Sequence, residues 1–154
     1  MDTTQLDALL AEEERLTFSR FDADTAFDLG SRLRAEAARR GGAVAIDVTI
    51  NGRTLFSSAM VGTTADNAGW IARKRAVVER FDHSSWYMKL LYEARGTTIA
   101  ERSLLSPAEY APNGGAYPIR VAGADRIGVV TVSGLPQADD HRLVVDVLTA
   151  MIAA

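Results

Sequence analysis

Apolar residues in the first 40 positions recur three and four places apart, which is the period of a helix. This spacing predicts one helix over 4–16 and a second over 24–40. Gly41 and Gly42 follow the second helix, and glycine is the residue that most often ends a helix. The chain is therefore expected to begin with two helices, and residues 1–22 are expected to form an N-terminal helical extension.

The pattern then changes to alternation. Between Ala43 and Ile50 every second residue is a large apolar one, which predicts a strand. Asn51-Gly52 is a strong signal for a two-residue hairpin turn, and 53–61 is the returning strand. Such a turn places Val48 opposite Leu55, so both side chains are expected on the same face of the sheet.

The remainder of the chain repeats this order of helices followed by a hairpin. Gly96 to Ala116 is the least periodic stretch and is predicted to be mostly loop, with a short helix or turn near Pro107–Tyr110. Two hairpins imply an antiparallel sheet, and the helices must cover at least one of its faces. The pattern thus predicts an α/β fold of the α+β type in one domain, 1–154. Helices are expected over 66–81, 86–95 and the C-terminal residues, and strands over 117–121 and 126–133, the last in the centre of the sheet.

The amino-acid composition excludes several classes of catalytic and metal site. The chain has no cysteine, which excludes disulfides, a cysteine nucleophile and a cysteine-based metal site. It has two histidines, His83 and His141, which are too few for a histidine-rich cage, and no metal site is expected. The formal net charge of −3 argues against nucleic acid as a partner. The one basic run, Arg73-Lys74-Arg75, points in three directions on a helix and does not change that expectation.

The chain shows no sign of a membrane or secretion signal. No apolar run approaches the roughly 18 residues that span a bilayer. The first 14 residues are acidic, whereas a signal peptide begins basic and continues apolar. A cytoplasmic protein that does not bind membranes is therefore expected.

Lysine is scarce, and the position of one lysine is unusual. The chain has 15 arginines but only two lysines, Lys74 and Lys89. Lys74 shares a helix face with Trp70, Val77 and Phe81, although a lysine without a partner rarely occupies an apolar face. Either its side chain extends to the rim of the helix, or it points into a pocket with Asn67 and holds an anionic or carbonyl group. Asn67 by itself is also explained as a helix cap.

A second candidate site lies between two predicted helices, at Asp82-His83-Ser84-Ser85. Ser84 and Ser85 either cap the following helix or, with its free N–H groups, hold a carboxylate or phosphate. His83 is a candidate ligand, a candidate general base or an ordinary turn residue. His141 near the start of the last helix is interpreted as a helix-surface or interface residue rather than a metal ligand.

Several short motifs in this order resemble the haem-degrading-domain family, that is, the GlcG/HbpS-like proteins, and within it the shorter branch of uncharacterised conserved proteins. The resemblance spans nearly the whole chain. It rests on Leu55-Phe56, Thr64-Ala65-Asp66-Asn67 with Trp70 and Lys74, His83-Ser84-Ser85, Gly114-Gly115-Ala116-Tyr117-Pro118-Ile119, and Val132-Ser133-Gly134-Leu135-Pro136 with Asp140-His141.

The resemblance implies a profilin-like domain with an antiparallel sheet of about five strands, flanked by helices and closed by a C-terminal helix. It also implies homo-oligomers built from dimers, and it makes haem a candidate cofactor because some relatives bind or degrade haem. The ligand-binding residues that the motifs and the resemblance together predict are Asn67, Trp70, Lys74, His83, Ser84, Ser85, Tyr117 and His141.

Three functions remain open at this point. The first is an oligomeric protein that binds a small molecule, with haem as the named candidate. In that case Lys74 or an arginine meets the propionates and His83 or His141 approaches the iron. The second is a non-catalytic oligomeric adaptor, in which the same residues build a subunit interface. The third is an acid/base enzyme that uses Lys74, Asp140 or His141.

Overall fold

The computed structural model describes residues 3–153; residues 1, 2 and 154 of the expected domain lie outside the described part. Most of the predicted elements are present within a residue or two of their expected ends. The elements are α1 (Thr4–Arg15), β1 (Thr17–Phe18), α2 (Ala23–Arg39), β2 (Ala45–Ile50), β3 (Arg53–Ala59), α3 (Ala65–Phe81), α4 (Ser85–Ala94), α5 (Ile99–Ser103), β4 (Ala116–Val121), β5 (Arg126–Ser133) and α6 (Gln137–Ala153).

The five strands form one sheet in the order β1-β4-β5-β2-β3. The expected central position of β5 is confirmed. The sheet is mixed rather than antiparallel throughout, because β1 pairs in parallel with β4, Thr17 lying opposite Arg120. This edge strand was missed because two residues are too few to show an alternating pattern. It also means that the N-terminal extension is not purely helical.

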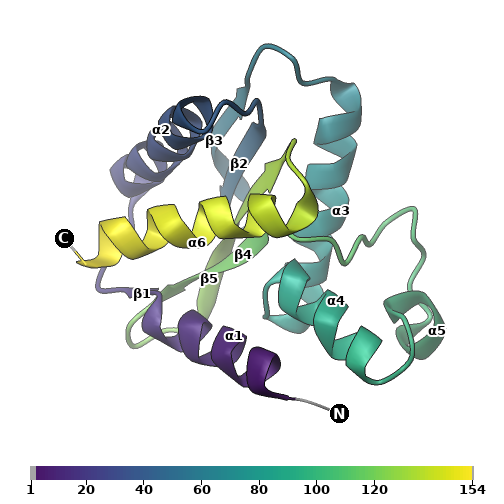
Figure 1. The fold of residues 1–154 in the computed structure, drawn as a ribbon. Coiled ribbons are helices and arrows are strands. Elements are labelled where there is room, and N and C mark those ends of the chain that lie inside the picture. Colours follow the sequence, from purple (N-terminus) through teal and green to yellow (C-terminus); the bar gives the residue numbers. More distant parts are fainter. Residues whose placement is uncertain (1–2, 154) are drawn as a thin grey trace.

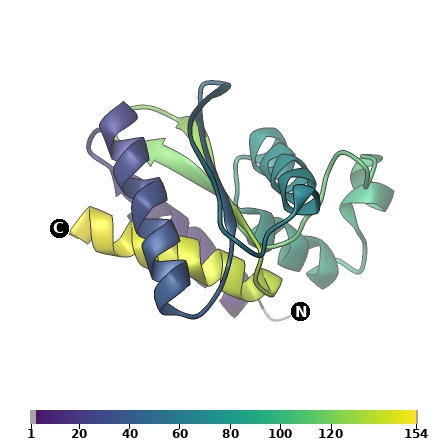
Figure 2. The same cartoon turned by 90° about the horizontal axis from the view of Figure 1, so that it is seen from above.

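Helices cover both faces of the sheet. Helices α2 and α6 pack together on one face, and α3 lies across β5, β4 and β2 on the other, with α4 and α5 beyond it (Figures 1 and 2). Strand β2 is therefore buried on both sides along most of its length, so that even Asp47 and Thr49 are buried. No helix among residues 3–153 has the length and apolar character needed to cross a membrane.

Three apolar clusters of the described residues follow from these layers, and the smallest, formed by Val78, Ala116 and Val129, lies between α3 and the sheet. The largest lies between the sheet and α2 with α6, and its fully buried residues include Leu29, Leu33 and Leu143. The second joins α1 to α4 and includes Leu9 and Tyr87. The short helix α5 was not predicted; the turn near Pro107–Tyr110 is present, but the helix begins earlier, after the capping residue Thr98.

The register of the first hairpin differs from the prediction. Ile50 pairs with Arg53 as expected, but the register shifts between Val48 and Thr49, so that Val48 lies opposite Phe56 instead of Leu55. One extra residue in β3 is the mark of a β-bulge. The bulge places Phe56, rather than Leu55, against α2, where its ring lies over Gly30.

Candidate functional site

The structure separates the eight predicted ligand-binding residues into two groups. Asn67, Trp70 and Lys74 line one hollow, which we call the polar hollow. The other five residues surround the N-terminus of α4. The polar hollow has a volume of about 320 Å³ and is lined by Asp66, Asn67, Trp70, Lys74, Asn113, Ser133, Gly134, Leu135, Gln137 and Asp140.

Lys74 forms a buried ion pair in the wall of the polar hollow. Its Nζ lies 3.0 Å from Oδ2 of Asp140 and also donates to the carbonyl oxygen of Val132 at 3.0 Å. Asp140 in turn accepts from the backbone N–H groups of Gly134 and Leu135. The Lys74 side chain is 3% exposed, so the interpretation in which it extends to the helix rim is wrong. Its partner comes from α6, 66 residues further along the chain.

Burial shifts the pKa of both members of this pair. Desolvation lowers the pKa of Lys74, and the neighbouring Asp140 carboxylate opposes that effect. Desolvation likewise raises the pKa of Asp140, against the opposing effects of Lys74 and the N–H groups of Leu135 and Gly134. The pair is held together because every oxygen and the ammonium have hydrogen-bond partners inside the protein.

Asn67 is a helix cap, and it also lines the polar hollow. Its Oδ1 accepts from the backbone N–H of Thr64 and completes a capping box at the start of α3. Its Nδ2 donates to the Ser133 hydroxyl across the polar hollow at 3.2 Å. Trp70 lies one turn later, with the Arg73 guanidinium 4.2 Å from its ring centroid.

The N-terminus of α4 binds a carboxylate of the protein itself, that of Glu13. Ser84 is the cap, because its hydroxyl accepts from the N–H of Tyr87 at 3.1 Å. Ser85 accepts from the N–H of Ala116 at 3.0 Å and ties α4 to β4. The backbone N–H of Ser84 donates to Oε1 of Glu13, a buried residue of α1, at 2.6 Å. The anion site expected here is thus filled by a side-chain carboxylate.

The same carboxylate positions His83. Oε2 of Glu13 lies 2.7 Å from Nδ1 of His83, and an ionised carboxylate only accepts, so Nδ1 is assigned as the donor of this hydrogen bond. The imidazole is 38% exposed, and none of the described residues bonds to Nε2. It borders a second depression, which we call the His83 hollow, of about 430 Å³. That hollow is lined by Leu10, Glu13, Glu14, Thr17, His83 and Arg120.

Tyr117 and His141 lie deeper, beside α4. His141 is 2% exposed, so the expectation of a helix-surface residue is wrong; its ring lies 5.8 Å from that of Tyr117 and 6.4 Å from that of Trp86. Neither ring nitrogen of His141 nor the Tyr117 hydroxyl forms a hydrogen bond with the residues described. Burial raises the pKa of Tyr117 well above its usual range. Glu12 Oε1 approaches His141 Nε2 at 3.7 Å.

The three basic side chains of α3, at positions 73–75, all contact other groups of the protein. Arg73 stacks on Trp70, Lys74 pairs with Asp140, and Arg75 lies 3.2 Å from Asp47. The three side chains form no common basic stripe, which agrees with their expected divergence on a helix. The absence of a nucleic-acid partner stays a prediction.

Comparison with known proteins decides the family. Residues 21–149 match the family model described as haem degrading protein HbpS-like. The chain belongs to this family. Relatives of the HbpS-like chain include a UPF0303 protein of Edwardsiella ictaluri, 48% identical over 94% of this chain and 92% of the relative. The sequence-based assignment to the shorter branch of uncharacterised proteins is therefore confirmed.

Solved structures share the fold of this HbpS-like chain. The crystal structure of the Ybr137w protein has a TM-score of 0.90, at 35% identity over 96% of this chain and 88% of that one. A PduOC:Heme complex has a TM-score of 0.67 at 15% identity, covering 87% and 95% of the two chains. The second likeness shows the fold alone. The family match begins at residue 21, so Glu13 and the rest of α1 lie outside it.

Proposed function

We propose that this HbpS-like chain is an oligomeric haem-binding protein, and that His83 is the residue that would hold the haem iron. The observation that carries the proposal is the imidazole of His83, which is half-exposed and presents Nε2 beside a hollow while Nδ1 is bonded to a buried carboxylate. The family description as haem degrading and the haem bound by the distant PduOC neighbour support the choice of ligand.

The residues around His83 suit haem better than those elsewhere in the described chain. A histidine that ligates iron usually donates its other ring N–H to an acceptor, which fixes the ring and raises its basicity; Glu13 is placed to do this. Leu10 offers an apolar contact. Arg120, which donates to the Asp82 carbonyl and lies 3.8 Å from Oε2 of Glu13, is the cation nearest to hand for a propionate. By contrast, His141 is buried, and the ammonium of Lys74 is committed to Asp140. Bound haem would supply an iron centre able to take small diatomic ligands.

Hemin titration tests this ligand. The apo protein is expected to give a saturable shift of the Soret band near one hemin per chain. His83→Ala should weaken binding at least about tenfold, because losing the iron bond removes more than about 1.4 kcal/mol. The matched control is the other histidine: His141→Gln should stay within about threefold of the parent. An absent shift, or equal binding by the parent and His83→Ala, would overturn the proposal.

The oligomer belongs to the same proposal and is measured on the same samples. Light scattering should give a mass that is a multiple of 16.6 kDa, with dimers as the building unit. A single-chain mass would contradict it. Three large apolar residues are exposed and could be buried in a subunit interface. They are Phe27 (65% exposed), Val61 (98%) and Leu104 (85%).

The alternative functions are separated by these two measurements. A defined oligomer that binds no hemin would favour the adaptor. The acid/base enzyme has less support, since Lys74 is paired with Asp140 and His141 has almost no exposed surface. A cytoplasmic location is part of the same proposal.

A further inference from the structure

The polar hollow and the His83 hollow share no lining residue, so the proposed haem site leaves the polar hollow without a role. We infer that the polar hollow is a second ligand site, which takes a small uncharged molecule with carbonyl or hydroxyl oxygens. The inference rests on the donors that line it, on its balance of charge, and on the bonds that hold its walls in place.

Several hydrogen-bond donors line the hollow beside the carboxylate of Asp66, and not all of them are used within the protein. The Asn113 amide and the Trp70 indole N–H have no hydrogen-bond partner among the described residues. The Lys74 ammonium has three N–H bonds, of which Val132 and Asp140 use two. The Ser133 hydroxyl accepts from Asn67 and keeps its own proton to donate. A ligand that offers oxygen acceptors would satisfy these groups.

The charges in the hollow argue against an anion. The charge of Lys74 is balanced by Asp140 at 3.0 Å, so it cannot attract a carboxylate as a free ammonium would. Asp66 adds an exposed negative charge to the lining. The formal sum over these three residues is −1, which repels an anionic ligand. Of the two groups that the sequence left open near Lys74, an anion and a carbonyl, these charges favour the carbonyl.

The walls are held in place before any ligand arrives. Asn67 is bonded at both ends of its amide, to Thr64 and to Ser133. The backbone of Gly115 comes so close to Lys74 that a Cβ there would lie 2.8 Å from Nζ. Gly115 also has a φ of +135°, which a glycine adopts far more readily than other residues. Donors fixed in this way lose little entropy on binding a ligand.

Three probes of similar length and different charge test the inference. They are succinamide (uncharged), succinate (anionic) and putrescine (cationic), each titrated at constant ionic strength. The reporter is the fluorescence of Trp70 in a Trp86→Phe background, which leaves one tryptophan in the chain. Succinamide should produce a saturable change at about millimolar concentration. Succinate should bind at least about fivefold more weakly, because the lining carries a formal charge of −1. Putrescine is attracted by that charge but has no acceptor for the unpaired donors, so it should also bind more weakly than succinamide.

Variants locate the binding. Asn113→Ala removes one unpaired donor and should weaken succinamide binding about fivefold, the usual worth of one hydrogen bond. Gln5→Ala removes an exposed amide of α1 and should change nothing. His83→Ala should also leave succinamide binding unchanged, so this result is independent of the hemin titration. No saturable change with succinamide, equal or tighter binding of succinate or putrescine, or full binding by Asn113→Ala would overturn the inference.

Discussion

Lys74 is buried because Asp140 reaches it from another helix. A lysine on an apolar helix face signals that a partner is needed, but the spacing along α3 does not say which carboxylate it is. Asp140 looked like a first-turn acid that favours a helix N-terminus, and it does lie in the first turn of α6. Its other role, as the partner of Lys74, exists only once α3 and α6 meet at the end of β5.

Removal of the Lys74 charge should destabilise the folded protein. Lys74→Met leaves Asp140 buried and unpaired, and should lower the free energy of unfolding by about 3–5 kcal/mol. Lys89, the other lysine, supplies the control, because its pair with Glu93 is largely exposed on the Glu93 side and its replacement by Met should cost about 0.5 kcal/mol or less. Urea unfolding at pH 7 measures both variants. Equal losses in the two would contradict the role of the buried pair.

Glu13 is the functional residue that sequence reasoning passed over, although a signal was present. It occupies the apolar stripe of the first helix, in phase with Leu6 and Leu9. The same argument that singled out Lys74 applies to it, since a carboxylate on a buried face needs donors. The structure supplies them from Ser84 and His83.

At the scale of elements, α2 packs closely on β3 of the sheet because Gly30 has no side chain. The bulge in β3 brings the Phe56 ring beneath Gly30, and a Cβ on Gly30 would meet ring carbons at 2.2–2.4 Å. Phe27 also makes an edge-to-face contact with the same ring. The close packing of α2 on β3 therefore depends on the absence of a side chain at position 30.

Two glycines in helices give a matched test of this packing. Gly30→Ala should destabilise the protein by about 1–3 kcal/mol, because helix and strand must separate to admit the methyl group. Gly69→Ala in α3 meets nothing within 4 Å, and should stabilise it by up to about 1 kcal/mol through helix propensity. Thermal and urea unfolding measure both changes. A Gly30→Ala protein as stable as Gly69→Ala would show that Phe56 moves aside freely.

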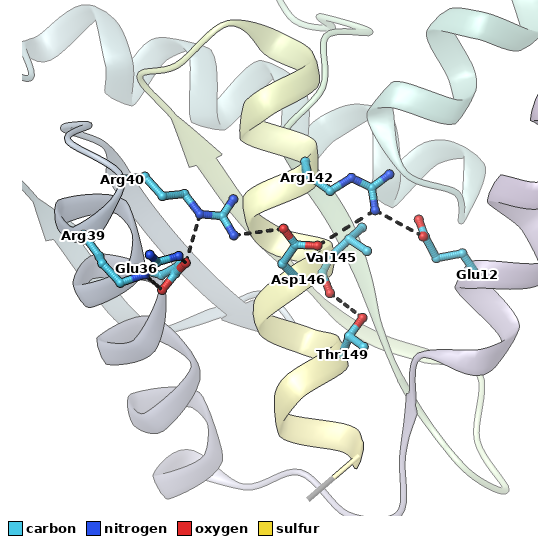
Figure 3. A network of polar contacts seen from close by, with 8 residues as sticks. All are labelled: Glu12, Glu36, Arg39, Arg40, Arg142, Val145, Asp146 and Thr149. Carbon is cyan, nitrogen blue, oxygen red and sulfur yellow. Dashed lines mark hydrogen bonds and ion pairs between the residues drawn. The ribbon is translucent and has the colours of Figure 1, made fainter.

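At the scale of the molecule, a chain of charges joins three helices on one side of the sheet. Arg40, the C-cap of α2, lies 2.9 Å from Asp146 of α6, and Arg142 of α6 lies 3.5 Å from Glu12 of α1 (Figure 3). His141 and Arg142 lower the pKa of Glu12. The ionised Glu12 therefore favours the folded state in which α1 is docked.

This arrangement predicts a pH dependence. The pKa of Glu12 in the folded state lies below the 4.5 of the free side chain, so its stabilisation is fully present above about pH 4.5 and is lost as the pH falls through the folded value. Glu12→Gln should lower stability at pH 7, and the gap to the parent should shrink by pH 3. Glu14→Gln, an exposed neighbour on α1, should show no such gap. Urea unfolding at both pH values decides; a gap that stays constant would rule out ionisation as its source.

Local patterns determined most of the elements of this protein. The helices α1, α2, α3, α4 and α6 and four of the strands follow from spacing, caps and the Asn51-Gly52 turn, because these depend on neighbours within a few residues. The motifs also identified the family, which the comparisons confirm. Asn67, Trp70 and Lys74 could be grouped because they share one helix face.

Only the tertiary structure decided the pairing of distant groups. The parallel strand β1 and the bulge opposite Val48 depend on contacts between segments far apart in the chain. The same is true of the separation of the eight predicted residues, of which three line the polar hollow and five surround the N-terminus of α4. The balance of charge at Lys74 also depends on such a contact, and it is the ground on which we favour the carbonyl over the anionic ligand, both of which the sequence left open. The physical reason is that a side chain's charge and burial are set by whatever packs against it, and periodicity describes only the helix or strand to which it belongs.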